Sequence, residues 1–180
     1  MKKMIFFLLV LSSVARAGDP ASRSTEESAR LVQAALEQIA WTQSTHDTNT
    51  ECSTYVSRVL ARSGMPVGGF VSNEFDQVMA THLPEWRHSE FAVINPGGDQ
   101  QALQNFLDNA ADGAVFLAQW PRVGRSGHVA IIEKVSLDHF EIYQAQQGLS
   151  LPHSASARVA QLLYPGTNGG GRPRLRLFFD

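Results

Sequence analysis

The chain has 180 residues, of which 43% are apolar and 18% are charged. This composition is typical of a single globular domain and excludes a disordered, collagen-like or coiled-coil protein. The formal net charge of −2, from 15 basic and 17 acidic residues, provides no overall positive field for binding nucleic acid or an anionic membrane. The single cysteine excludes an internal disulfide and a cluster of thiolates for structural zinc.

The first seventeen residues are typical of a secretory signal peptide. Two lysines precede an apolar run over residues 5–11, and the small-residue pattern Ala15-Arg16-Ala17 follows. The run is too short to span a bilayer. We therefore expect cleavage after Ala17, export to the periplasm or the medium, and one mature domain over residues 18–180. Removing the three basic residues of this segment from the 15 leaves 12 against 17 acidic residues, a net charge of −5.

A helix is predicted from the capping box at Ser24 to about Trp41. Apolar residues recur at helical spacing along it and predict a stripe that faces the core. The stripe consists of Leu31, Ala35, Leu36 and Ile39.

Cys52 begins the second predicted helix. Apolar residues recur at helical spacing over residues 53–62, Thr48–Thr50 precede as possible caps, and Gly64 with Pro66 is a typical stop signal. The unpaired N–H groups and the dipole at a helix start favour a thiolate, which lowers the pKa of the thiol and makes the sulfur nucleophilic. The same N–H groups can receive an oxyanion. The alternative is a buried cysteine with a purely structural role.

Helices and strands then alternate along the chain. The predicted order is a short helix capped by Ser72 or Asn73 and ending at Pro84, a strand over residues 91–94, a turn over 95–98, a helix over 101–110 and a strand over 114–118.

A β-hairpin is predicted over residues 128–146. His128 begins a strongly β-prone run directly after Gly127, and a turn at residues 136–138 leads into a second alternating strand. Of the six histidines, His128 has the surroundings expected of a base for a cysteine nucleophile. On a two-residue period, Gln144 or Gln146 lies beside its ring, where a polar side chain can fix the tautomer. A solvent-facing glutamine is the alternative.

The C-terminal region contains a glycine-rich linker over residues 164–171 and an alternating strand over residues 174–179. We expect this strand to close the sheet. The sequence contains no internal repeat and no second domain.

Three motifs together resemble the NlpC/P60 family of papain-like cysteine peptidases over about residues 30–148. They are Glu51-Cys52-Ser53-Thr54-Tyr55-Val56 at a helix start, Asp112-Gly113-Ala114-Val115-Phe116-Leu117 at a strand entry, and Gly127-His128-Val129-Ala130-Ile131 before Tyr143-Gln144-Ala145. The CHAP amidases are a related second choice. The resemblance implies an α+β, papain-like NlpC/P60-type fold, with a nucleophile helix packed on a small antiparallel β-sheet.

The resemblance also implies an activity, namely cleavage of amide bonds in peptidoglycan stem peptides. Cys52 would act as the nucleophile, His128 as the base and Gln144 as the third member of the triad. Glu51 and Ser53, which flank the nucleophile, are expected to contact the substrate. This chemistry requires no metal and no organic cofactor.

The chain departs from the family pattern at several positions. The family usually has Asp-Cys-Ser-Gly where this chain has Glu51 to Thr54, and its third catalytic residue is most often histidine. The family also has a tyrosine upstream of the nucleophile that assists the oxyanion hole. The mature chain has no tyrosine before Tyr55, and Trp41 is the candidate substitute.

Residues 119–126 are predicted to form a loop beside His128 that serves as a substrate wall. Trp120, Arg122 and Arg125 are its candidate binding residues, because arginine can grip the carboxylates of stem peptides through two parallel hydrogen bonds. A solvated loop is the alternative. Two other functions stay open: a degenerate module that binds wall peptides or a partner protein, and a thiol amidase or transpeptidase acting on another envelope substrate. Regulation by a protein partner is also left open.

Overall fold

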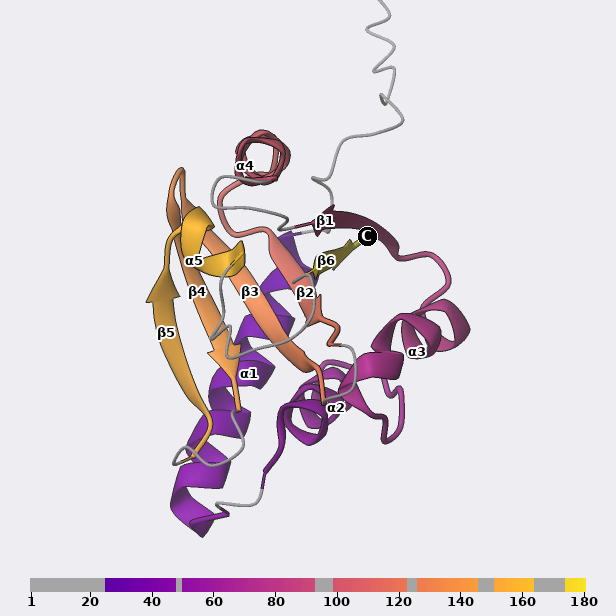
Figure 1. Ribbon diagram of the computed structural model, residues 1–180. Coiled ribbons are helices and arrows are strands. Elements are labelled where there is room, and N and C mark those ends of the chain that lie inside the picture. The colour runs from indigo at the N-terminus through magenta and orange to yellow at the C-terminus, as the bar shows by residue number, and fades with distance from the viewer. Residues whose placement is uncertain (1–24, 48–49, 93–98, 123–125, 146–150, 164–173) are drawn as a thin grey trace, which may run out of the picture.

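The computed structural model describes residues 25–47, 50–92, 99–122, 126–145, 151–163 and 174–180. Within these residues six strands form one antiparallel sheet (Figure 1). The strands are β1 (Arg87–Ala92), β2 (Val115–Trp120), β3 (His128–Ser136), β4 (His139–Gln144), β5 (His153–Ala157) and β6 (Arg174–Phe179). Their order across the sheet is β1-β6-β2-β3-β4-β5. The coarse prediction of an α+β fold with an antiparallel sheet is therefore confirmed.

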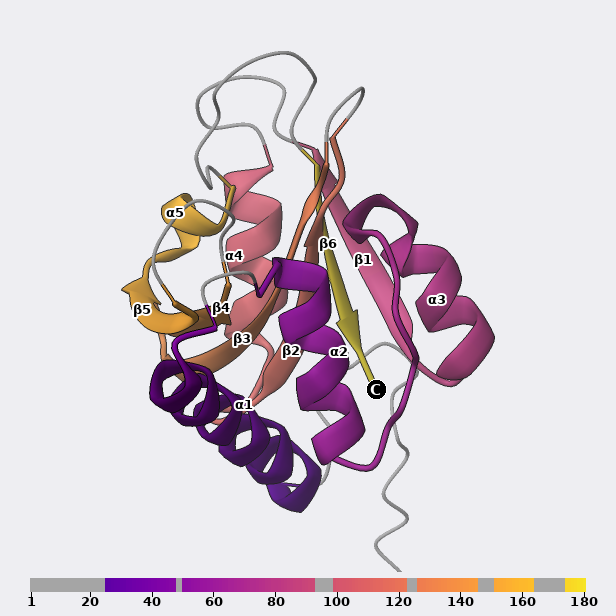
Figure 2. The same cartoon turned by 90° about the horizontal axis from the view of Figure 1, so that it is seen from below.

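Helices cover both faces of the sheet (Figure 2). The helices are α1 (Thr25–Thr45), α2 (Cys52–Arg62), the 3-10 turn η1 (Ser72–Glu74), α3 (Phe75–His82), α4 (Gln100–Asp108) and α5 (Val159–Leu163). On one face lie α1, α2 and α3, and on the other lie α4 and α5. The antiparallel sheet is thus buried on both sides and divides the apolar core into two clusters.

The alternation of side chains along the central strands builds both clusters. Leu117 of β2 and Ile131 of β3 point to the face that α2 covers, where Val56 is also fully buried. Phe116 and Ile132, their neighbours in sequence, point to the face that α4 and α5 cover. Burial on both faces explains why the central strands are near-continuous apolar runs, and it fixes α2 firmly against the sheet.

The local predictions around Cys52 are confirmed. Helix α2 begins at Cys52 and ends at Arg62, and Gly64 follows with φ of 88°, a left-handed conformation that favours glycine. The cap differs: Glu51 is the N-cap residue, in an extended conformation and without a side-chain cap hydrogen bond. The hairpin of β3 and β4 is also confirmed, with Ile132 opposite Ile142.

Other expectations need correction. Helix α1 runs to Thr45, and Leu36 is 45% exposed because it lies off the buried stripe. Strand β1 begins at Arg87, and β2 continues to Trp120. Strand β6 pairs with both β1 and β2, so it lies inside the sheet and does not close an edge.

The sequence patterns did not predict β5 or α5. The signal peptide, the turn over residues 95–98 and the linker over residues 164–171 lie outside the described residues. None of the helices in the described part of the chain is both long and apolar enough to cross a membrane.

A buried lysine ties α4 to the sheet. The Lys134 side chain on β3 is 4% exposed, and its ammonium donates to the carbonyl oxygens of Leu107 and Ala110 at 2.9 and 2.6 Å. These carbonyls lie at the C-terminal end of α4, where the helix lacks its own donors and where a positive charge is favourable. Asp112 lies 3.8 Å from the ammonium.

We predict that Lys134→Met lowers the free energy of unfolding by about 2 kcal/mol, because two buried carbonyls lose charged donors. Arg158→Met is the matched control: Arg158 forms an exposed ion pair with Asp138 at 3.8 Å, and its loss should cost less than about 0.5 kcal/mol. Denaturant titration of both variants measures the difference. Equal effects would contradict the assignment of Lys134 as a helix cap.

Candidate active site

Cys52 is the first residue of α2 and is partly buried. The preceding residue, Glu51, has an exposed side chain, and its carbonyl accepts the first hydrogen bond of the helix from the N–H of Tyr55 at 2.8 Å. The apolar face of α2 packs on β3 and β4, so the sulfur stands at the end of the sheet where β3 begins. The thiol therefore has the location at a helix start that favours its ionised form.

His128, the first residue of β3, lies near enough to the Cys52 side chain to lower the pKa of its thiol. Its Nε2 lies 2.8 Å from Oε1 of Gln144, the last residue of β4. Because an amide oxygen can only accept, Nε2 carries a proton and Nδ1 is the nitrogen available to the sulfur. The structure thus brings together the three residues predicted from the sequence, and Gln144 holds the imidazole in one tautomer.

Burial and three neighbouring groups determine the ionisation of Cys52. Burial raises the pKa of the thiol, but the hydrogen bond and the positive charge of His128 lower it, as do hydrogen bonds from the Ser72 hydroxyl and the Val129 backbone. Together they lower the pKa of Cys52 from 9.0 to about 7. At neutral pH a large fraction of the molecules therefore carries Cys52 as the thiolate, which is the nucleophilic form.

Gly127 allows the chain to pass close to the site. A Cβ at this position would collide with the side chain of Asn73, which follows Ser72 on η1. Asn73 accepts a hydrogen bond from the N–H of Arg122 at 3.1 Å and donates to its carbonyl at 3.0 Å. Arg122, which follows β2, is thereby bonded to η1, and Gly127, which precedes His128, lies close to it.

Trp120 has a different place from the one predicted. It is the last residue of β2 rather than a loop residue, is 3% exposed, and donates its indole N–H to the carbonyl of Leu162 at 2.7 Å. Its ring stacks on His128 with 5.5 Å between ring centroids. The assignment of Trp120 to a substrate wall is therefore wrong. Strand β2 continues past Ala118 and ends before Pro121. The Trp120 side chain is buried in the core and packs against the His128 ring from there.

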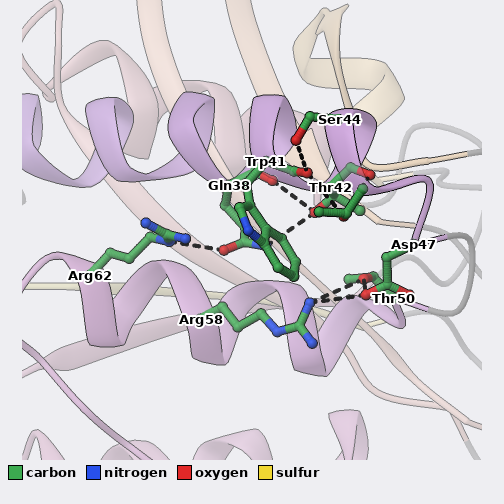
Figure 3. A network of polar contacts seen from close by, with 9 residues as sticks. Gln38, Trp41, Thr42, Ser44, Asp47, Thr50, Arg58 and Arg62 are labelled. Atoms are coloured by element: carbon green, nitrogen blue, oxygen red, sulfur yellow. Dashed lines mark hydrogen bonds and ion pairs between the residues drawn. The ribbon is translucent and has the colours of Figure 1, made fainter.

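Trp41 also lies elsewhere. Its indole is 42% exposed on α1 and lies 5.1 Å from the guanidinium of Arg58 on α2 (Figure 3). Arg58 in turn bonds Asp47 at 3.2 Å and Thr50 at 3.3 Å, on the segment that leads into Cys52. The contacts of the Cys52 sulfur do not include Trp41. The structure therefore places this tryptophan in a network that fastens α1 to α2, and not at an oxyanion hole.

The remaining predicted residues are distributed as follows. Ser53 is 6% exposed within α2, and this burial argues against direct contact with a large substrate. Arg122 is exposed immediately after β2. Arg125 and the alternative third residue, Gln146, lie outside the described residues.

Two features of the site were not predicted. Ser72, expected only as a helix cap, has its hydroxyl 3.1 Å from the Cys52 sulfur, because the chain returns to the nucleophile after α2. His153, interpreted as a surface residue, lies on β5 directly opposite Gln144, so both point to the same face of the sheet. Ser72 is 20 residues from Cys52 along the chain, and β5 has no strand pattern that the sequence analysis recognised, so no motif spacing indicated either approach.

Comparison with models of known families, with curated proteins and with solved structures finds no significant match for this chain. Among the described residues, no group of three or more His, Cys, Asp or Glu side chains is arranged to hold a metal ion.

We predict that iodoacetamide alkylates the single cysteine with a rate that rises through pH 7 and levels off above about pH 8, because only the thiolate reacts. His128→Ala should move the midpoint well above 8, since its hydrogen bond and charge both lower the pKa. Mass spectrometry of the intact protein measures the rates. A midpoint near 9 in the unmodified protein would show that Cys52 is an ordinary thiol.

Proposed function

We propose that this chain is an exported cysteine hydrolase that cleaves amide bonds in peptidoglycan stem peptides. The observation that carries the proposal is the chain of contacts from the Cys52 sulfur through the His128 ring to the Gln144 amide. His128 lowers the pKa of the Cys52 thiol, and Gln144 bonds the His128 ring at 2.8 Å. A nucleophile, a base and an orienting group in this order are what acyl transfer by a thiol requires.

Acylation follows from this geometry. The Cys52 thiolate attacks the carbonyl carbon of the scissile amide, and the negative charge moves to the carbonyl oxygen. Backbone N–H groups at the start of α2 stabilise this oxyanion. The protonated His128 donates its Nδ1 proton to the departing amine as the C–N bond breaks, leaving a thioester on Cys52.

Deacylation returns the enzyme to its starting state. Water attacks the thioester while neutral His128 accepts its proton. The C–S bond then breaks, the carboxylic acid leaves, and the sulfur is again a thiolate beside an imidazolium. Gln144 accepts a hydrogen bond from Nε2 throughout, so it orients the ring without changing its own protonation.

Three observations support a substrate in the cell wall. The order and spacing of the Cys52 and His128 motifs resemble NlpC/P60 peptidases, and the nucleophile helix packs on an antiparallel sheet as a papain-like arrangement requires. Residues 1–17 are typical of a signal peptide. Arg122 is exposed beside η1, and arginine is a residue type that can bind the carboxylates of a stem peptide.

We predict that residues 18–180 release new fragments from purified peptidoglycan, detected by mass spectrometry of the muropeptides, and that the fragment masses identify the bond that is cut. Cys52→Ala should abolish release because it removes the nucleophile. His128→Ala should lower the rate at least 100-fold because the leaving amine loses its proton donor.

The other outcomes identify the alternatives. Binding of stem peptides by both the unmodified protein and Cys52→Ala, without cleavage by either, would indicate a binding module. New amide links formed to an added amine would indicate a transpeptidase, since the same thioester can be intercepted by an amine. A reactive Cys52 with no change in peptidoglycan would retain the thiol chemistry and exclude this substrate.

Gln144→Ala should lower kcat about 10- to 100-fold while changing the free energy of unfolding by less than about 1 kcal/mol. The reason is that the imidazole loses its orienting acceptor at a strand end, where little packing depends on the side chain. Gln101→Ala is the control: Gln101 is exposed on α4, away from Cys52, and its side chain bonds Asn105 at 2.8 Å, so turnover should be unchanged. Unchanged turnover of Gln144→Ala would move the orienting role elsewhere.

A further inference from the structure

The hydroxyl of Ser72 stands next to the sulfur on a segment of chain separate from α2 and β3. Ser72 is the first residue of η1, is 2% exposed, and its Oγ lies 3.1 Å from Sγ of Cys52. A buried hydroxyl without a partner is costly, so this contact is the place where its hydrogen-bonding capacity is used.

The direction of this hydrogen bond follows from the state of the sulfur. A thiolate has no proton and can only accept, so Ser72 is the donor when Cys52 is ionised. Hydrogen bonds to an ionised acceptor are about twice as strong as those between neutral groups. The Ser72 hydroxyl therefore favours the thiolate over the thiol, in addition to the effect of His128.

The backbone of Ser72 is held by a buried polar chain. Gln119 of β2 is fully buried and donates from Nε2 to the Ser72 carbonyl at 2.8 Å. Its Oε1 accepts from Arg176 of β6 at 3.3 Å. An amide with both ends engaged in this way cannot turn without breaking a buried hydrogen bond, so it fixes the position of η1.

Arg176 is itself fixed by two carboxylates. Its guanidinium bonds Asp76 of α3 at 2.7 Å and Glu90 of β1 at 2.6 Å, and the pKa of Glu90 is lowered mainly by this hydrogen bond. The C-terminal strand is thereby connected to the nucleophile through Gln119 and Ser72. None of these residues belongs to the triad of the proposed mechanism.

We propose that Ser72 is a catalytic residue that donates its hydroxyl hydrogen bond to the Cys52 thiolate and then to the oxyanion, with Gln119 and Arg176 as positioning residues. The oxyanion is separated from the sulfur by two bonds, so a hydroxyl that reaches the sulfur can turn to that oxygen. Ser72 thus supplies the side-chain donor for which Trp41 was the sequence candidate. This inference rests on the proposed thiol hydrolase function.

The test compares Ser72→Ala with the matched control Ser57→Ala. Ser57 lies on α2, and its exposed hydroxyl bonds the carbonyl of Gly68 at 2.6 Å, so it fastens the segment before η1 without touching the sulfur. Ser72→Ala should raise the midpoint of Cys52 alkylation by about one pH unit and slow acylation by an activated ester about 10- to 100-fold. Ser57→Ala should change neither.

Two further variants separate catalysis from structure. Ser72→Thr retains the hydroxyl and should keep the midpoint of Cys52 alkylation close to that of the unmodified protein. If Ser72 had only a structural role as a small side chain, the bulkier threonine would instead shift the midpoint at least as much as alanine. Gln119→Leu removes the donor to the Ser72 carbonyl and should raise the midpoint in the same direction as Ser72→Ala, by a smaller amount. Circular dichroism confirms that each variant is folded before it is titrated.

The outcomes distinguish this inference from the function on which it rests. A midpoint near 9 in the unmodified protein would contradict the hydrolase itself. A midpoint near 7 that Ser72→Ala leaves unchanged would overturn the role of Ser72 while retaining the hydrolase. A midpoint raised in Ser72→Ala, restored in Ser72→Thr and unaffected in Ser57→Ala is the result that we expect.

Discussion

The contact between the Cys52 sulfur and the His128 ring is the interaction on which the rest of the site depends. This contact joins the first residue of α2 to the first residue of β3. It therefore requires one particular position of α2 along the helix axis relative to the sheet. The fully buried residues of α2, which include Tyr55 and Val56, provide that constraint through close packing on the central strands. A core that is filled in this way resists sliding of α2 along the sheet, so apolar packing determines where Cys52 lies relative to His128.

Polar and aromatic side chains then orient the groups that apolar packing brings together at Cys52. His128 is held on one edge by the Gln144 amide and on its face by buried Trp120, while Ser72 approaches the sulfur from η1. Trp120 is also held by its hydrogen bond to the Leu162 carbonyl, and the backbone of Ser72 is held by Gln119. In a partly buried site such fixed dipoles stabilise charge more strongly than water would, and this explains how burial and a lowered pKa occur together at Cys52.

The sequence predicts what depends on neighbouring residues and misses what depends on distant ones. Helix α2 and the hairpin of β3 and β4 follow from local periodicity and stop signals, and the hairpin alone brings Gln144 to His128. By contrast, β6 enters the sheet between β1 and β2, and Ser72 returns to the sulfur, through contacts between segments far apart in the chain. Trp120 was misplaced for a local reason, since its neighbours Gln119 and Pro121 resemble loop residues although the strand continues to it.

Trapping of an acyl-enzyme tests whether Cys52 acts as a nucleophile. The protein is mixed briefly with an activated ester of a short peptide, quenched in acid, and examined by intact mass spectrometry and peptide mapping. We predict a single acyl group on Cys52 that is lost on incubation at neutral pH with release of the free acid. In Gln144→Ala, the acyl-enzyme should accumulate only if the substitution slows deacylation more than acylation. A protein that remains unmodified, or that carries its acyl group on another residue while Cys52 stays free, would contradict this chemistry.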